Sequence, residues 1–366
     1  MAIYIGLIIF ILLITCILSC TENNLKRRQK KIAFWGMLAV FLVLALKAPS
    51  VGTDIFGYSQ QYYIAEVMPW SDFDYVYFEK GYILLEKIFS KIGVSFQLYT
   101  VLIYGVEAFA WYKLFSKYSK DTCLSILFII CYQFFVFSMS GLRQAIAMSI
   151  CIFAFLAFNQ FNTRGTVLSI VLTAAAVGIH QSAVAYIFVV AAVLITKAGR
   201  RVGLINIVAL IGGAFFCRGV LWRFVNLFLK RVDVGAEVSL GGAFWFQLLI
   251  FAFSLFTFLR YYGTRVYLSR STSSTCQNPY EESLTLRLSL YTIATYILFS
   301  GGVLLRSTMY MTMFVTAFIP HLIYKYTRGS RTIIKVVLVI VLIYTFYTQT
   351  LITNQLNILP YRFYWQ

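Results

Sequence analysis

Long apolar segments separated by short polar ones run through the chain from end to end. A membrane-spanning helix needs roughly 20 mostly apolar residues, and about twelve segments approach that length. They are residues 2–20, 32–48, 96–114, 122–139, 142–159, 166–179, 182–196, 202–217, 242–259, 287–304, 307–324 and 333–349. The pattern predicts an all-α, polytopic transmembrane helical bundle, in which 166–179 and 182–196 form a helical hairpin.

The polar segments between these predicted spans differ in charge. Basic residues cluster at 26–31 and again after every second span, and the positive-inside rule places such loops in the cytoplasm. Both termini are then extracytoplasmic. We expect one integral membrane domain, 1–366, with extracytoplasmic loops at 49–95 and 218–241 and a cytoplasmic loop at 260–286.

The first outer loop, 49–95, is rich in tyrosine, tryptophan and phenylalanine. Such residues at a membrane surface commonly form an interfacial belt. Aromatic faces beside carboxylates also suit sugar rings, so a glycan contact is the alternative. Within this loop, residues 83–92 place apolar side chains at helical spacing with charges on the other face, which predicts a short interfacial helix.

Composition excludes a soluble fold. Of the 366 residues, 60% are hydrophobic and 12% are charged, whereas a soluble domain has roughly a quarter charged residues. The net charge of +18 is spread over small clusters between apolar segments, which argues against nucleic-acid binding. Seven cysteines, an odd number without a CxxC motif, predict neither a disulfide framework nor a cysteine metal site.

Three basic residues at predicted outer helix ends are candidates for binding an anion. Arg143 lies at the outer mouth of a span, Arg306 lies between two spans, and Lys47 ends the second span. An arginine near the membrane interface normally has a partner or a function, and its planar fork suits phosphate. We expect the three to converge on one dianionic group. The alternative for Arg143 is snorkelling or an internal ion pair, for instance with Glu107.

Two residues are candidates for a general base. His180 lies in the outer turn of the predicted hairpin, and a neutral imidazole can accept a proton from a hydroxyl; a hydrogen-bonded structural histidine is the alternative. Asp54 opens the first outer loop, where it either caps the helix that follows or acts as the base. The chain has no DxD-type carboxylate pair, so we expect no metal.

Several short motifs occur in order along the chain. They are Lys47 before Val51-Gly52-Thr53-Asp54, then Tyr58, Phe78-Glu79-Lys80-Gly81-Tyr82, Gly141-Leu142-Arg143-Gln144, Ile179-His180-Gln181-Ser182, and Arg306 with Tyr310. This ordered set closely resembles the EpsG family, which belongs to the Wzy-like polysaccharide polymerases of bacterial envelopes. The family usually has an arginine where this chain has Lys47, and lysine keeps the charge but loses the bidentate fork.

The resemblance implies a metal-independent, inverting membrane glycosyltransferase with a GT-C-like fold and no cofactor. It would join oligosaccharide repeat units on undecaprenyl diphosphate at the outer face of the bacterial plasma membrane, for an O-antigen, capsule or exopolysaccharide. Membrane lipid and a chain-length regulator are the other expected partners. Arg143, Arg306 and Lys47 would bind the diphosphate, and His180 or Asp54 would be the base. The candidate sugar-binding residues are Tyr58, Glu79, Tyr82, Gln144, Gln181 and Tyr310.

Two other functions stay open at this level. A flippase or transporter of lipid-linked oligosaccharide would place charges at the membrane midplane and often shows inverted repeats. Here the charges gather at the outer rim and no clear repeat is visible, which favours an enzyme. An O-antigen ligase of related fold would share the diphosphate site and differ in its acceptor.

Overall fold

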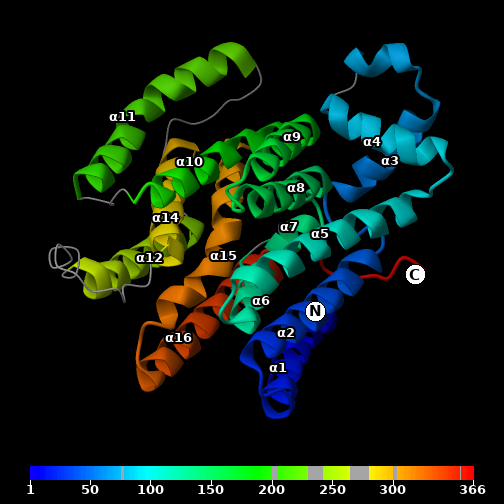
Figure 1. Cartoon of the computed structure of the whole chain (residues 1–366). Helices are drawn as coiled ribbons and strands as arrows, with labels where there is room; N and C mark the ends of the chain where they lie inside the picture. The colour runs from blue at the N-terminus through cyan, green and yellow to red at the C-terminus, as the bar shows by residue number, and fades with distance from the viewer. Residues whose placement is uncertain are drawn as a thin grey trace. The chain divides into compact units, whose positions relative to one another are not determined.

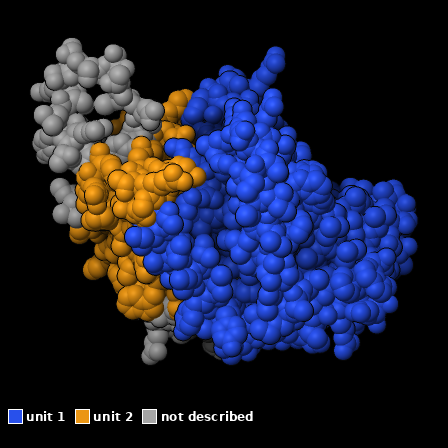
Figure 2. Space-filling view, turned by 90° about the horizontal axis from the view of Figure 1, so that it is seen from below, with its two compact units in different colours: residues 1–184, 332–366 blue, residues 185–331 orange. Residues whose placement is uncertain are grey.

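The computed structural model describes residues 1–75, 78–132, 134–199, 204–229, 242–263, 280–299, 303–354 and 356–366. These residues form helices, with one isolated bridge between Lys47 and Phe363 and no strand within the described ranges. The chain divides into two compact units, coloured separately in Figure 2. Unit 1 is Met1–Val184 with Thr332–Gln366, and unit 2 is Ala185–Arg331. The all-α prediction is confirmed for the described chain.

Unit 1 contains the N-terminal helices and the C-terminal segment. Its elements are α1 (Ala2–Thr21), α2 (Leu25–Ala45), α3 (Ile55–Val67), η1 (Trp70–Tyr75), α4 (Lys80–Lys91), α5 (Phe96–Tyr118), α6 (Thr122–Cys131), α7 (Phe134–Ser138), α8 (Leu142–Phe158), α9 (Thr163–Ile179), most of α16 (Arg328–Phe346) and η5 (Tyr347–Ile352). In Figure 1, α1 lies beside α2 and α8 beside α9, and α2 also packs on α5 and α6.

Polar residues fix where several helices of unit 1 begin. The side chains of Asn24, Ser95, Asp121 and Asn162 each accept a hydrogen bond from a backbone N–H in the first turn of the helix that follows. Such caps satisfy donors that the helix itself leaves unpaired. The apolar runs after them therefore start as helices at defined positions.

One predicted span differs from the structure. The apolar stretch 122–139 is divided into α6, which ends at Cys131, and the five-residue α7. Tyr132 has φ −105° and ψ 51°, outside the helical region. Neither proline nor glycine lies at this break, so the break depends on tertiary packing that hydropathy does not report.

Unit 2 is built around α14. Its elements are α10 (Tyr186–Lys197), α11 (Leu204–Leu229), α12 (Gly242–Phe258), η3 (Leu259–Gly263), α14 (Tyr280–Phe299), η4 (Val303–Thr308) and α15 (Met309–Ile323), preceded by the last residue of η2 (Gln181–Ala185), whose other residues belong to unit 1. Helix α14 packs on α10, α11, α12 and α15. Buried Leu286, Ile293 and Ile297 of α14 meet Phe244 and Phe251 of α12 in one apolar core.

Among the described residues, three helical segments are long and apolar enough to cross a membrane. They are Ala2–Thr21, Phe244–Tyr261 and Arg328–Ile352. Shorter apolar helices are Thr122–Cys131, Leu142–Phe158, Thr163–Ile179, Gln181–Lys197 and Asn206–Gly219. These segments fit a membrane protein, and the count of about twelve spans stays a prediction.

The predicted loops are only partly described. The stretch 218–241 begins inside α11, which continues to Leu229, and residues 230–241 lie outside the described residues. The stretch 260–286 begins in η3 and ends in α14, and residues 264–279 lie outside the described residues. The loop assignment is therefore not tested there.

The short helix predicted at 83–92 is present as α4, but two of its charged residues, Glu86 and Lys87, do not face solvent, whereas Lys91 does. Glu86 and Lys87 are 0% and 1% exposed, whereas Leu84 and Ile88 are 41% and 47% exposed. On a water-facing helix the apolar side chains are buried and the charged ones are exposed. In the middle of α4 the arrangement is reversed, because Glu86 and Lys87 are buried and Leu84 and Ile88 are exposed.

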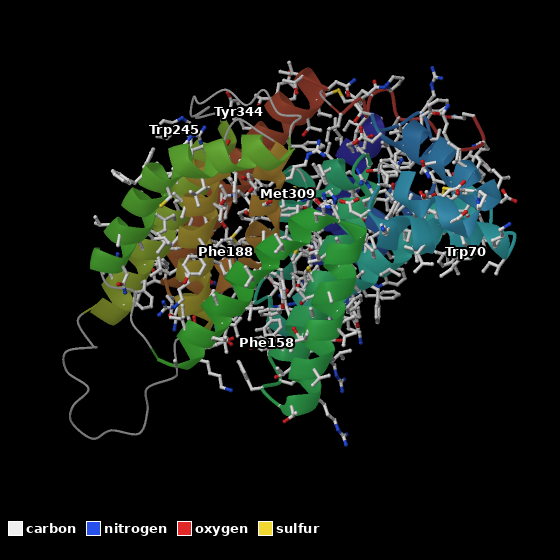
Figure 3. All side chains as sticks on the ribbon, turned by 90° about the horizontal axis from the view of Figure 1, so that it is seen from above. Trp70, Phe158, Phe188, Trp245, Met309 and Tyr344 are labelled. Atoms are coloured by element: carbon white, nitrogen blue, oxygen red, sulfur yellow. The ribbon has the colours of Figure 1, made fainter. Side chains whose placement is uncertain are left out.

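Lys87 joins α4 to the end of α3. Its Nζ donates to the carbonyl of Ala65 at 3.3 Å and also to that of Met68, and it lies 4.8 Å from the centre of the Trp70 ring. Trp70 is labelled in Figure 3 beside the blue and cyan ribbon of this region. A cation at a helix C-terminus complements the helix dipole. The contact thus holds α3, η1 and α4 together.

Candidate active site

Two helix ends meet closely in unit 1. A Cβ on Gly81 in α4 would lie 2.5 Å from the carbonyl oxygen of Gly178 in α9, so glycine permits this approach. Glu79 is the N-cap residue of α4, and His180 is the C-cap residue of α9. The packing therefore sets carboxylate beside imidazole, with Glu79 Oε1 2.9 Å from His180 Nδ1.

The Glu79 carboxylate has partners on both oxygens. Oε1 also accepts a hydrogen bond from the backbone N–H of Gln181 at 3.2 Å, and Oε2 forms an ion pair with Nη1 of Arg143. The side chains of Glu79, Arg143 and His180 are 13%, 16% and 18% exposed. Burial opposes ionisation, but the His180 hydrogen bond, the Arg143 charge and backbone N–H groups outweigh it and lower the pKa of Glu79 to about 2.

Three aromatic rings surround the guanidinium of Arg143 in the first turn of α8. Its Cζ lies 4.1 Å from the centre of the Phe78 ring, 5.7 Å from that of Tyr58 and 6.0 Å from that of Tyr82. The rings contact one another at centroid distances of 5.6 to 5.9 Å. Nε also donates to the Tyr58 hydroxyl at 3.3 Å. Ring faces attract a cation, so this aromatic cage fixes the position of the charge.

The histidine and carboxylate form an orienting pair. Because Glu79 is ionised, it favours the tautomer in which His180 Nδ1 carries the proton and donates it to Oε1. Nε2 then has the lone pair that can accept a proton. An imidazole held this way by a carboxylate is the usual arrangement of a general base.

Asp54 is attached to the same part of unit 1. Ser140 Oγ accepts a hydrogen bond from the backbone N–H of Asp54 at 3.2 Å and lies 2.6 Å from Oγ1 of Thr53. Asp54 is the N-cap residue of α3, but its carboxylate makes no capping hydrogen bond within the described first turn, and the residue is exposed. Helix capping by the side chain therefore does not explain the aspartate at position 54. Sequence reasoning missed Ser140, whose one signal is its place three residues before Arg143.

Lys47 lies in an enclosed position. It is 4% exposed, its Nζ donates to the carbonyl of Val51 at 2.9 Å, and Nζ lies 5.8 Å from the centre of the Tyr104 ring. Its backbone forms the isolated bridge with Phe363. The amine is thus engaged by the segment that follows it.

The C-terminal segment covers this strip of chain, which sequence reasoning also missed. Backbone N–H groups of Ala48 and Gly52 donate to the carbonyls of Arg362 and Asn357 at 2.8 and 3.1 Å. Gly52 has φ +105°, and a Cβ there would overlap the carbonyl oxygen of Met139. The segment 46–54 is therefore held between 357–364 on one side and the chain before Arg143 on the other.

The remaining candidates lie in different surroundings. Gln144 is buried in α8, and Gln181 is exposed. Arg306 is exposed in η4 and Tyr310 is buried in α15, both in unit 2. Unit 1 thus brings together six of the predicted site residues, namely Tyr58, Glu79, Tyr82, Arg143, His180 and Gln181. Within the described part of the chain, no three His, Cys, Asp or Glu side chains are grouped to hold a metal ion.

Apolar helices are consistent with a membrane protein, and one of its units holds a caged guanidinium beside a carboxylate–imidazole pair. The model of the EpsG family matches residues 30–363, so the chain belongs to the EpsG family. This family is related to the Wzy-like polysaccharide polymerases, which are glycosyltransferases in general. The family prediction is confirmed. No curated protein and no solved structure matches the chain.

Proposed function

We propose that this protein is a polysaccharide polymerase that joins oligosaccharide repeat units carried on undecaprenyl diphosphate and releases undecaprenyl diphosphate. The observation that supports it most is the position of Glu79, which contacts both Arg143 and His180. Glycosyl transfer from a lipid diphosphate needs an anion-binding group and a base close together. This pair of contacts provides both kinds of group in one place.

The guanidinium of Arg143 is the proposed contact for the diphosphate of the donor. A guanidinium has five N–H donors, and within the described residues the structure engages Nε and Nη1. The rest of the planar fork suits phosphate oxygens. Arg306 and Lys47 are the further candidates, and the enclosed amine of Lys47 is the less accessible of the two. Negative charge that develops on the leaving diphosphate is stabilised by such fixed cations.

His180 is the proposed base for the acceptor hydroxyl. Its Nε2 accepts the proton while the hydroxyl oxygen attacks the anomeric carbon, the bond to the diphosphate oxygen breaks, and the configuration inverts. Glu79 orients the imidazole and stabilises the imidazolium that forms. This assigns Glu79 an orienting role rather than a sugar contact, and leaves Asp54 as the alternative base. Gln144, Tyr58, Tyr82, Gln181 and Tyr310 stay candidates for sugar contacts.

The expected setting is the bacterial plasma membrane, with both termini and the site on the extracytoplasmic side. Basic residues cluster after every second predicted span, beginning at 26–31, and acidic residues are enriched in the loop 49–95. Both patterns support this orientation, the first through the positive-inside rule. A GT-C-like bundle of about twelve spans, a metal-independent reaction and a chain-length regulator as partner belong to the same proposal.

The test is a deletion strain complemented with wild-type, His180→Ala or Asp54→Asn protein. Its glycan ladder is read alongside the lipid-linked intermediates. We expect deletion to leave single repeat units on an outward-facing carrier, His180→Ala to fail and Asp54→Asn to restore polymer. The reverse result for the two variants would make Asp54 the base.

Accumulation of unreacted units on the cytoplasmic face would instead identify a flippase. Full-length chains that fail only to reach their final lipid acceptor would identify a ligase. Membrane levels of each variant, measured by immunoblot, separate loss of chemistry from loss of protein.

A further inference from the structure

A buried carboxyl lies behind the aromatic cage. Glu86 in α4 is 0% exposed, and two tyrosines with the same exposure, Tyr82 of α4 and Tyr99 of α5, have buried hydroxyls. Among the side chains that the structure describes, neither oxygen of Glu86 and neither hydroxyl has a hydrogen-bond partner within ordinary distance. Buried polar atoms of this kind are rare in folded proteins and call for an explanation.

These three groups belong to one cluster. Tyr82 and Glu86 are four residues apart on α4 and so share a face. Burial, and next the neighbouring Tyr99 and Glu86, raise the pKa of Tyr82 well above its ordinary value. The Tyr99 ring lies 5.4 Å from that of Phe89 in α4 and 5.0 Å from that of Tyr62 in α3. Tyr82, Glu86 and Tyr99 are therefore close enough to influence one another where α3, α4 and α5 pack together.

The charge state of Glu86 follows from this position. Burial raises its pKa to about 8, although the nearby Tyr82 hydroxyl and the charge of Arg143 act in the opposite direction. At neutral pH the carboxyl is therefore largely protonated and can donate as well as accept a hydrogen bond. Arg143 is already paired with one carboxylate, that of Glu79. A second negative charge behind the cage would weaken the attraction of the site for an anion.

We propose that Glu86 is a positioning residue of the Arg143 site. Held as a neutral carboxyl between Tyr82 and Tyr99, with enclosed water completing their hydrogen bonds, it fixes the Tyr82 ring against the guanidinium without adding charge. A polar cavity with two to four partners is where proteins retain such water. The inference rests on the proposed function only where polymer formation is the readout.

The direct test is infrared difference spectroscopy of the full-length protein in lipid nanodiscs at neutral pH. A protonated carboxyl has its own C=O stretching absorption, apart from that of a carboxylate. We expect Glu86→Gln to lose one such band relative to wild type, and the wild-type band to shift in D2O because the acid proton exchanges for deuterium. Glu107→Gln is the matched control. Glu107 is a second buried carboxyl, but it accepts a hydrogen bond from Ser138 Oγ and does not belong to the cluster of Tyr82, Glu86 and Tyr99.

Polymer formation gives the second readout. Glu86→Gln keeps a neutral hydrogen-bonding group, so we expect turnover within about twofold of wild type. Glu86→Leu leaves the tyrosine hydroxyls without that group and lets Tyr82 shift, so we expect the donor concentration for half-maximal rate to rise about tenfold. An unchanged spectrum in Glu86→Gln, or equal activity of the Gln and Leu variants, would overturn the inference. If no variant and no wild-type protein makes polymer, the proposed function fails while the spectral result still decides the state of Glu86.

Discussion

Arg143 and Arg306 have the same predicted role but occupy opposite kinds of environment. Arg143 in unit 1 is 16% exposed, surrounded by three rings and paired with Glu79. Arg306 in unit 2 is exposed on η4, a short 3₁₀ segment. A cation fixed before its ligand arrives loses little freedom on binding, whereas an exposed arginine must be ordered by the ligand.

The difference separates two uses of one residue type. Unit 1 holds its guanidinium in place at a structural cost, because the charge is partly desolvated and needs Glu79. Arg306 in unit 2 is exposed, so its charge stays solvated and carries a smaller desolvation penalty. Binding and stability should therefore be more strongly coupled at Arg143 than at the exposed Arg306.

The largest expected effect is that of Arg143→Ala. Polymer should disappear, and stability should fall by about 2 kcal/mol because Glu79 is left partly buried without its ion-pair partner. Polymer is read on the glycan ladder and stability as the thermal midpoint of the purified protein. Arg143→Lys is the matched control and should recover stability better than activity, since it restores charge without the fork. Full-length polymer from Arg143→Ala would remove this arginine from the site.

Arg306→Ala should separate the two readouts. We expect polymer yield to fall by about a hundredfold, the cost of one preorganised anion donor. The free energy of unfolding should change less than in Arg143→Ala, because the side chain is exposed and solvent screens the contacts that it makes. A large drop in thermal midpoint would show that Arg306 is a structural residue and would end the contrast with Arg143.

Gly81→Ala changes the surroundings of Arg143 without touching its side chain. The new Cβ meets the Gly178 carbonyl, so α4 and α9 must separate and Glu79 must move from His180. We expect a loss of about 1–3 kcal/mol in stability and about tenfold in polymer yield. Gly178→Ala is the control, because a Cβ there meets no described atom within 4 Å. Equal effects of the two substitutions would argue against close packing as the cause.

The last prediction concerns how the stability of the protein depends on pH through Glu79 in unit 1. The pKa of Glu79 is lower in the folded protein, about 2, than its ordinary 4.5. Its contribution to stability is therefore complete above pH 4.5 and is lost as the pH falls from 4.5 towards 2. Thermal midpoints of wild type and Glu79→Gln should converge over this interval. A constant gap between them would show that protonation of Glu79 does not matter.

Sequence patterns predicted the individual residues of the site better than their contacts. Arg143 and His180 stood out because charged and titratable groups are rare in an apolar chain, whereas Glu79 was identified only through the resemblance to the EpsG family, as a sugar contact. Their meeting was not predictable, since it depends on the approach of Gly81 to Gly178, two glycines 97 positions apart. The sequence suggested Glu107 as an ion-pair partner of Arg143, whereas the structure pairs Arg143 with Glu79 and Glu107 with Ser138.

The hydropathy pattern predicted the positions of the helices well, but it predicted less well which face of a helix is buried. In the part of the chain that the structure describes, the predicted spans fall largely on helices, but the break after Cys131 has no local sequence signal. The periodicity at 83–92 identified α4, yet Glu86 and Lys87 point inward. Which face of a short helix is buried depends on its neighbours, here the C-terminus of α3 and the rings around Arg143.

The hydrogen bonds from Ala48 and Gly52 to Arg362 and Asn357 have a consequence for biosynthesis. Residues 47–54 leave the ribosome early, but the carbonyls that hold them are synthesised only after every helix of unit 2. A nascent chain interrupted before residue 357 would insert its helices and still lack the contact that seats Gly52. Packing of the segment 46–54 is thus a late event of translation, completed long after the residues around Arg143 have been synthesised.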